Sequence, residues 1–259
     1  MDFILPTFDP NSHKGEKGKV LIIGGSHRYH GAPIFSIKAA EAAGADLIEA
    51  FVPQVHSILT KEFALNAFIN SFVKDALGLK DVGAIINATK RADAMLLGIG
   101  LGKETDTLRA IKLILSDVSI PTVLDADALL PEIFEIERNY PLVITPHTGE
   151  YQRLFGEDAT EESAIKQAKK HNIYIVIKSR IDIIASPNNL YRNHTGCPQM
   201  RVGGTGDALA GIITSYIAQG LDPFDASVSA CHYYGLLGEH LAKTQKTFTT
   251  MDSVRNYNK

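Results

Sequence analysis

Cysteine, long apolar runs and an excess of one charge sign are all scarce in this sequence, and each scarcity excludes a class of protein. Two cysteines, Cys197 and Cys231, stand among 259 residues. They are too few for a disulfide framework, and their spacing is not that of a metal site. No apolar run approaches the ~18 residues needed to span a bilayer, and no basic segment at the N-terminus indicates a signal peptide. We therefore expect a cytoplasmic protein without a membrane partner.

The charge balance gives no electrostatic case for nucleic acid as a partner. The formal net charge is -3 and the pI is near 6.3, with lysine and arginine scattered along the chain. At 259 residues and 45% hydrophobic content, the chain is long enough to bury one large core.

Two common nucleotide-binding motifs are also missing. After the first apolar run, Gly24, Gly25 and Gly31 do not have the G-x-G-x-x-G spacing of a dinucleotide-binding fold. No glycine precedes a Lys-Ser or Lys-Thr pair at P-loop spacing. Neither a Rossmann dinucleotide site nor a P-loop is therefore expected.

Short apolar strands alternate with helical patterns along most of the chain. Strands are predicted at 19–23, 46–52, 94–100, 121–127, 142–145 and 173–178, with a hairpin at 181–185 and 189–192. Helices are predicted at 33–43, 104–116, 204–219 and 223–243, whereas residues 54–80 give no clear prediction. The alternation indicates an α/β fold with a mostly parallel sheet covered by helices on both faces. We expect residues 1–18 to form an N-terminal arm and residues 19–259 a single domain.

Polar and glycine-rich clusters follow the predicted strands, at 24–32, 98–102, 125–127 and 145–150. In sheets of this kind ligands bind beyond the carboxyl ends of the strands. The clusters therefore predict one composite site at that edge of the sheet.

The run Gly203-Gly204-Thr205-Gly206-Asp207 precedes apolar residues at helical spacing. A glycine turn there brings backbone N–H groups together at the first turn of a helix, where the dipole favours an anion. A carboxylate beside that anion hole is a base for a hydroxyl that meets a phosphate. The alternative is a plain glycine-rich turn in which Asp207 caps the helix.

Other candidate residues have two interpretations each. His147 with Glu150 either contacts a polar ligand or caps the next helix. Asp125 and Asp127 either hold Mg²⁺ through water or form a turn at a strand end. Lys178 either reaches a nucleotide phosphate or extends to the surface.

Two further segments, one rich in glycine and one rich in histidine, also have two interpretations each. Gly100 and Gly102 either let a ligand approach the backbone or make a turn. The segment His27-Arg-Tyr-His30 either lines the mouth of a substrate site or is a loop surface.

An ordered set of segments resembles one enzyme family. The segments are Gly24–Pro33 (with Gly-Gly-Ser, a tyrosine and Gly-Ala-Pro), Gly98-Ile-Gly-Leu-Gly102, the Asp-Ala-Asp-Ala-Leu at 125–129, the Thr-Pro-His-Thr-Gly-Glu at 145–150, and 193–211. Each is weak alone, but together they are similar to the ADP/ATP-dependent NAD(P)H-hydrate dehydratases, which have a ribokinase-like fold.

The resemblance implies a repair enzyme that dehydrates the S epimer of hydrated NADH or NADPH. The reaction consumes ADP or ATP and, with ADP, releases phosphate and AMP. The resemblance places the substrate near Ala32, Gly100, His147 and Asp207, and the adenine nucleotide along Lys178, Ser179, Arg180, Ile181 and Asp182 and at Gly204, Thr205 and Gly206.

The chemistry of the residues agrees with that reaction. Hydroxide is a poor leaving group, so the ring hydroxyl must become a phosphate ester before it is lost. Asp207 is the expected catalytic base, and the amides of Gly204, Thr205 and Gly206 are expected to stabilise the charge on the transferred group. Mg²⁺ is expected to bridge the phosphates, with ligands that the sequence does not identify.

One departure from the family pattern is Ser179-Arg180, because the family usually has a glycine beside the lysine. Many relatives also carry an N-terminal epimerase domain, and about 18 residues precede the first strand here. The resemblance therefore implies a separate epimerase, together with a homo-oligomeric assembly.

Two alternatives to the dehydratase remain open at this point. A small-molecule kinase of the same fold, acting on a thiazole or pyrimidine alcohol, would share the Gly-Thr-Gly-Asp base and anion hole. A non-catalytic sensor would use the same pocket to bind adenine nucleotide.

Overall fold

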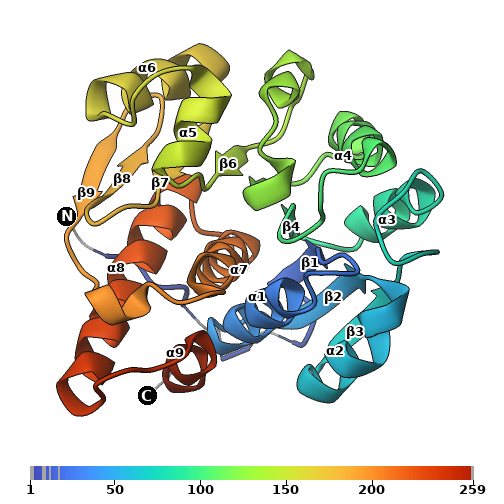
Figure 1. The fold of residues 1–259 in the computed structure, drawn as a ribbon, viewed down its shortest axis with the longest axis horizontal. Helices are drawn as coiled ribbons and strands as arrows, with labels where there is room; N and C mark the ends of the chain where they lie inside the picture. Colours follow the sequence, from blue (N-terminus) through green and yellow to red (C-terminus); the bar gives the residue numbers. More distant parts are fainter. Residues whose placement is uncertain (1–2, 8–9, 12, 17, 258–259) are drawn as a thin grey trace.

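The computed structural model describes residues 3–7, 10–11, 13–16 and 18–257. Nine strands form one sheet: β1 (Lys19–Ile23), β2 (Leu47–Val52), β3 (Ala67–Ser71), β4 (Ala94–Leu97), β5 (Thr122–Leu124), β6 (Leu142–Ile144), β7 (Tyr174–Ile177), β8 (Asp182–Ala185) and β9 (Leu190–Asn193). Their order is β3-β2-β1-β4-β5-β6-β7-β8-β9, so that β3 and β9 lie at opposite edges (Figure 1). Strands β1 to β7 are parallel, and β8 and β9 complete the sheet in antiparallel pairs.

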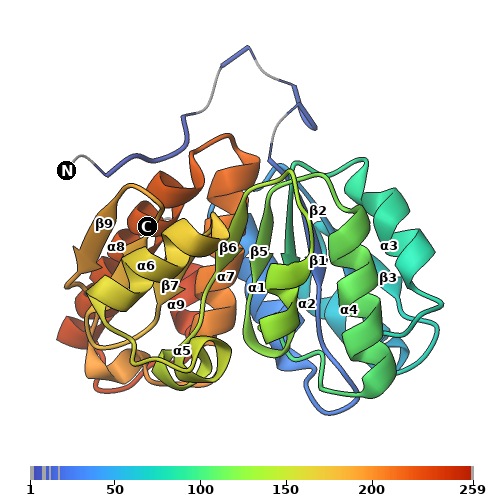
Figure 2. The same ribbon diagram turned by 90° about the horizontal axis from the view of Figure 1, so that it is seen from above.

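Helices cover both faces of this sheet. The helices are α1 (Gly31–Ala42), α2 (Ser57–Phe63), α3 (Val82–Thr89), α4 (Thr105–Asp117), α5 (Thr148–Phe155), α6 (Glu161–His171), α7 (Thr205–Ala218), α8 (Pro223–Thr244) and α9 (Thr250–Asn256). In Figure 1, α1, α7, α8 and α9 lie below the sheet, and α3 to α6 lie above it. Figure 2 shows the same layers from above. The predicted α/β architecture is therefore confirmed.

The strands of the parallel region are apolar throughout because both of their faces are buried. In β1, Val20 and Ile22 join the core on the α7 side, whereas Leu21 and Ile23 join the core on the α4 side. Side chains alternate between faces along a strand, so a strand covered on both sides reads as a continuous apolar run.

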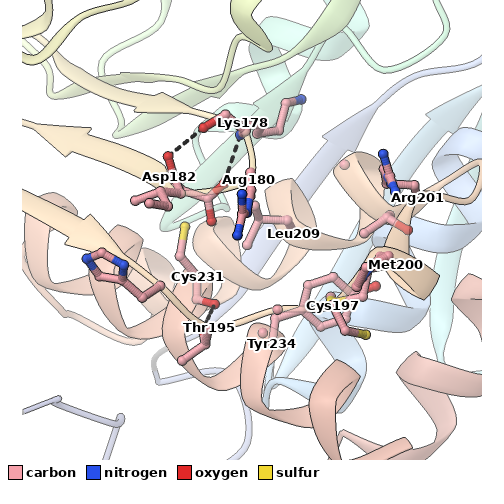
Figure 3. Close-up of a pocket in the computed structure, with 18 residues that line it drawn as sticks. Lys178, Arg180, Asp182, Thr195, Cys197, Met200, Arg201, Leu209, Cys231 and Tyr234 are labelled. Atoms are coloured by element: carbon pink, nitrogen blue, oxygen red, sulfur yellow. Dashed lines mark hydrogen bonds between the residues drawn. The ribbon is translucent and has the colours of Figure 1, made fainter. Parts of the chain in front are cut away.

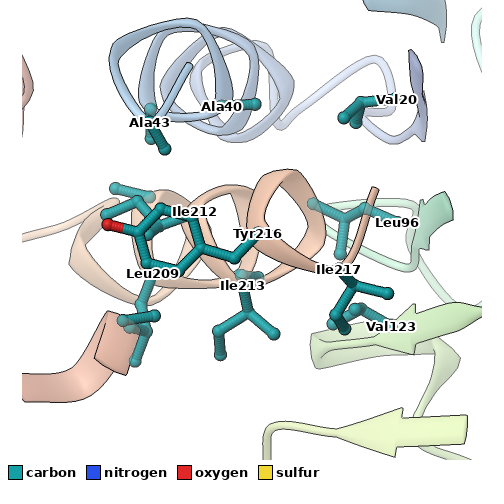
Figure 4. Packing of buried hydrophobic residues seen from close by; sticks show 14 of the residues in the cluster. Val20, Ala40, Ala43, Leu96, Val123, Leu209, Ile212, Ile213, Tyr216 and Ile217 are labelled. Atoms are coloured by element: carbon teal, nitrogen blue, oxygen red, sulfur yellow. The ribbon is translucent and has the colours of Figure 1, made fainter. Parts of the chain in front are cut away.

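Helix α7 is the most deeply buried helix of its layer. Leu209, Ile212, Ile213, Tyr216 and Ile217 pack between α1 and the strands (Figure 4). At Gly211 an added Cβ would lie 2.4 Å from the carbonyl oxygen of Ser36 in α1. Only glycine permits this close approach, which fixes the middle of α7 against α1.

The structure also contains elements that the sequence did not predict. Residues 54–80 hold a 3-10 helix (Gln54–His56), α2 and the edge strand β3, whose residues are only partly buried. The predicted strand at 121–127 ends at Leu124, and a 3-10 helix, Ala126–Ala128, follows. The predicted arm at 1–18 has no helix or strand in its described residues, and the rest of it lies outside them. None of the helices in the described part of the chain has the length and apolarity to cross a bilayer.

Candidate active site

Residues from three neighbouring strand ends meet at the carboxyl edge of the sheet. Asp125 follows β5, His147 follows β6, and Lys178 follows β7. Lys178 Nζ donates to Asp125 Oδ1 at 2.7 Å, and the Asp125 side chain is only 3% exposed. The backbone N–H of Lys178 donates to the carbonyl of Pro146, which keeps these two strand ends together beyond the sheet. The lysine is thus a fixed cation in a cluster of carboxylates.

Lys178 stays protonated in this position. Burial opposes its charge, but Asp125 pairs with it and Glu150 and Asp207 lie nearby, so that its pKa is raised overall. The Lys178 side chain therefore stays beside Asp125 and does not extend to the surface.

Asp207 lies in the first turn of α7, facing the same cluster. Its pKa is raised to about 7, mainly by burial and also by Asp125 and Asp127, while Lys178 lowers it in part. A carboxyl group with a pKa near neutrality takes up and gives back a proton at physiological pH. The helix cap is Gly204, without a side-chain capping bond, so Asp207 is not the cap.

The glycine turn before α7 has a conformation that only glycine adopts easily. Gly204 has φ +94°, and a Cβ there would lie 2.4 Å from the ring of Phe35 in α1. Thr205 Oγ1 donates to the carbonyl of Val202 at 3.1 Å. The hydroxyl of Thr250 in α9 donates to the carbonyl of Gly203 at 2.8 Å. These contacts hold the turn at the start of α7, where the helix dipole favours an anion. Of the three amides predicted for the anion hole, that of Thr205 donates to the carbonyl of Val202 at 3.4 Å.

A pocket of about 940 Å³ opens beside this turn (Figure 3). It is lined by Lys178, Ser179, Arg180, Ile181, Asp182, His194, Thr195, Gly196, Cys197, Pro198, Met200, Arg201, Thr205, Gly206, Leu209, Cys231, Tyr234 and Gly235. All of the predicted nucleotide-binding residues except Gly204 belong to this set. Three cations, Lys178, Arg180 and Arg201, stand on the wall beside the anion hole, which suits a polyphosphate.

The segment after Lys178 is held by the carboxylate of Asp182. Asp182 Oδ1 accepts from the backbone N–H of Ser179 at 3.0 Å, and Oδ2 accepts from the amide of Asn193 at 3.0 Å. Burial raises the pKa of Asp182, although both hydrogen bonds favour its ionised form. The Ser179 and Arg180 side chains are exposed at the pocket wall, so this departure from the family pattern does not fill the pocket.

The sequence analysis singled out 193–211 by its family resemblance but gave residues 194–201 and α8 no role in the pocket. Thr195 Oγ1 donates to the carbonyl of His232, 3.0 Å away on α8. A Cβ at Gly235 would lie 2.1 Å from Thr195 Oγ1, and one at Gly238 would lie 2.2 Å from the sulfur of Met200. Two glycines on one face of a long helix, three residues apart, were the sequence signal for this close approach.

The predicted substrate-binding residues lie beside the pocket and outside its lining. Gly100 has φ +62°, and a Cβ there would lie 3.2 Å from Cβ of Ala32 and 2.8 Å from Cβ of Tyr29. Ala32 and Gly100 are therefore neighbours. Asp207 and His147 both lie near Lys178 at the same edge. A role for these four residues in binding the substrate stays a prediction.

His147 caps α5. Its Nδ1 accepts from the N–H groups of Gly149 and Glu150 at 3.1 and 3.2 Å, and Glu150 Oε2 accepts from the N–H of His147 at 2.8 Å. This reciprocal pair is a capping box. The imidazole is still 59% exposed, and its Nε2 lies 3.5 Å from Glu150 Oε1.

The turn at 125–127 contains one strained residue between two carboxylates. Ala126 has φ +53°, a left-handed conformation that is costly for a residue with a Cβ. Asp127 Oδ2 accepts from the N–H of Gly102 at 2.9 Å. The described residues contain no cluster of three or more His, Cys, Asp or Glu side chains able to hold a metal ion. Mg²⁺ commonly takes one or two carboxylates plus phosphate oxygens and water, and Asp125 and Asp127 fit that mode.

Comparisons with known proteins agree with this geometry. Residues 20–258 match the family model described as NAD(P)H-hydrate dehydratase. The ADP-dependent (S)-NAD(P)H-hydrate dehydratase of Nitrosopumilus maritimus is 34% identical over 92% of this chain and 86% of its own length. A bifunctional NAD(P)H-hydrate repair enzyme of Methanothermobacter thermautotrophicus is 36% identical over 96% of this chain, which spans only 51% of that relative.

Solved structures give the same result. The ADP/ATP-dependent NAD(P)H-hydrate dehydratase of Bacillus subtilis, co-crystallised with ATP and Mg²⁺, superposes with a TM-score of 0.85 and 25% identity, covering 98% of this chain and 92% of its own. A ribokinase-like protein of Enterococcus faecalis gives a TM-score of 0.88 and 28% identity, covering 98% and 90%.

Proposed function

The chain belongs to the NAD(P)H-hydrate dehydratase family and has the ribokinase-like fold predicted from its sequence, and we propose that it dehydrates the S epimer of NADH or NADPH hydrate with ADP. The observation that carries this proposal is the position of Asp207. A carboxyl group whose pKa is raised to about 7 lies at the start of α7, beside a cation-lined pocket of about 940 Å³.

The first step is phosphoryl transfer to the substrate. The ring hydroxyl oxygen attacks the terminal phosphorus of ADP while Asp207 takes the hydroxyl proton, and AMP leaves. The amides at the start of α7 and the charge of Lys178 stabilise the transferred group. Mg²⁺, held by phosphate oxygens with Asp125 and Asp127, would neutralise part of the phosphate charge.

The second step removes the phosphate together with the substrate oxygen. The lone pair of the ring nitrogen expels phosphate by breaking the carbon–oxygen bond, and the neighbouring ring carbon then loses a proton. The balance is hydrate plus ADP to reduced cofactor, AMP and phosphate. Removing the oxygen as phosphate makes the elimination favourable, because phosphate is a far better leaving group than hydroxide.

Family membership does not favour the kinase or the sensor. A kinase would stop at the phosphate ester, and a sensor would have little use for a base beside an anion hole.

The test is product analysis with purified chain, NADHX, and ADP or ATP in parallel. We expect absorbance of the reduced nicotinamide to return, with one AMP released for each NADH formed from ADP. A stable phosphorylated hydrate without NADH would show a kinase. Tight nucleotide binding without either product would show a sensor.

A further inference from the structure

Three histidines and an arginine gather on a surface outside the pocket. His27, Arg28 and His30 belong to the loop between β1 and α1, and His56 ends the 3-10 helix after β2. The rings of His30 and His56 are 5.3 Å apart between centroids, and those of His27 and His56 are 6.4 Å apart. His56 Nε2 lies 2.8 Å from the carbonyl oxygen of His27. We refer to these four residues as the His/Arg cluster.

The loop that carries the cluster is fixed against the expected substrate residues. Tyr29, in the middle of the loop, is the residue whose Cβ packs against Gly100. Its N–H donates to the carbonyl of Ser26 at 3.0 Å, and the N–H of Gly25 donates to the carbonyl of Ile99 at 2.7 Å. The cluster is therefore an extension of the surface that Ala32 and Gly100 form.

Three side chains of the cluster are exposed to a ligand, whereas Nε2 of the half-buried His56 already donates to the carbonyl of His27. The His27 side chain is 77% exposed, and Arg28 and His30 are exposed as well. His30 precedes α1 without making a side-chain capping bond. Asp75 Oδ2 lies 3.8 Å from His27 Nδ1, and Asp75 Oδ1 accepts from the backbone N–H of Val55. A phosphate at His27 therefore shares this imidazole with Asp75. Imidazole N–H and guanidinium groups in this arrangement are donors for phosphate oxygens.

The order of the strands shows which part of the substrate reaches the cluster. The ADP pocket lies at the end of β7, whereas the cluster lies at the ends of β1 and β2, on the opposite side of β4 and β5. With the reacting ring between Gly100 and Asp207, the β7 side is taken by ADP. The rest of the substrate must extend the other way.

We propose that the His/Arg cluster binds a phosphate of the dinucleotide hydrate. The inference rests on the proposed function, because only that function places the reacting ring at Asp207. The phosphate is the pyrophosphate shared by NADHX and NADPHX, and the alternative source, the 2′-phosphate of NADPHX, is separated by the test.

The test uses the double variant His30→Gln/His56→Gln and the single variant Arg28→Gln. Three substrates are compared: NADHX, NADPHX, and a shortened hydrate, that of reduced nicotinamide riboside, which carries no phosphate. Losing a hydrogen bond to a charged group raises the KM for both dinucleotides by about tenfold. We expect kcat, the KM for ADP and the KM for the shortened hydrate to stay close to those of the parent. His240→Gln, at an exposed position on α8, is the matched control.

The outcomes separate the two sources and the two proposals. A rise confined to NADPHX assigns the cluster to the 2′-phosphate. Unchanged KM values, or an equal rise for the shortened hydrate, overturn the proposal. Equilibrium dialysis of NADHX against Asp207→Asn, with and without the cluster changes, measures binding without turnover. A parent that binds NADHX but never yields NADH would contradict the proposed function instead.

Discussion

The surroundings of Asp207 disfavour the ionised form of its carboxyl group and so make it a stronger base. Burial and the neighbouring carboxylates raise its pKa to about 7, and only Lys178 opposes them. The residue itself could be predicted as the base, because Gly-Thr-Gly-Asp before an apolar helix is a local pattern. Its pKa could not be predicted, because Asp125 and Lys178 approach it through the fold from distant parts of the sequence.

Replacing this carboxyl group separates chemistry from nucleotide binding. We expect Asp207→Asn to lower kcat by about 100-fold or more, because general-base catalysis contributes roughly 10²–10⁴-fold. ADP binding should change little, because the amide is isosteric and the pocket is lined by other residues. Steady-state kinetics and calorimetric titration with ADP are the measurements. Activity within tenfold of the parent would remove Asp207 from the role of base.

The same pKa predicts opposite pH trends for activity and stability. The base works when ionised, so kcat/KM should fall as pH drops below about 7. Because the folded state holds the Asp207 proton more tightly than the unfolded chain, this group stabilises the protein at low pH. That contribution is lost as pH rises from about 4 toward 7.

The predicted pH dependence of stability is tested by measuring the melting temperatures of the parent and of Asp207→Asn between pH 5 and pH 8. The variant has no carboxyl group at position 207 to ionise, so its advantage in melting temperature should grow with pH. An advantage that shrinks toward pH 8 would mean that the pKa of Asp207 is not raised.

At the scale of elements, predictability follows burial. Strands β1, β4, β6 and β7 are buried on both faces, and their apolar runs identified them. Strand β3 lies at the edge with partly exposed residues, so its sequence has no continuous apolar signal. The 194–201 side of the pocket escaped prediction because its residues depend on contacts with α8, more than thirty residues away.

The contact between α8 and the 194–201 segment can be tested at Gly235. A Cβ there would lie 2.1 Å from Thr195 Oγ1 and 2.7 Å from its carbonyl carbon. Gly235→Ala should therefore displace the 194–201 segment, destabilise the protein by about 1–3 kcal/mol and raise the KM for ADP by about tenfold.

Gly83→Ala in α3 is the matched control, because its Cβ meets nothing within 4 Å among the described residues. It should stabilise the protein by about 0.5–1 kcal/mol without changing the KM for ADP. Denaturant unfolding and ADP saturation curves give both values. A Gly235→Ala protein with parental ADP kinetics would show that α8 does not shape the pocket.

At the scale of the molecule, the sheet brings together residues that the sequence separates. Alternating strands and helices predicted a mostly parallel sheet, and that fold is confirmed. The site predicted at its carboxyl edge stays a prediction, although Asp125, His147 and Lys178 lie together there. The strand order was not predictable in detail, because hairpin β8–β9 and edge strand β3 are placed by tertiary packing. In that order, β7 and the pocket lie on one side of β4 and β5, and β1 and β2 with the His/Arg cluster lie on the other side.

The last prediction concerns the cooperativity of this single sheet. Both cores lie against the same strands, and the pocket joins β7, α7 and α8. We therefore expect one thermal transition that ADP raises as a unit. At 100 times its Kd, ADP adds about 2.7 kcal/mol, which corresponds to roughly 5–10 °C for a chain of this size. Calorimetry with and without ADP measures the shift, with GMP as the control nucleotide. Two transitions, of which ADP moves only one, would mean that residues 19–259 do not unfold as one domain.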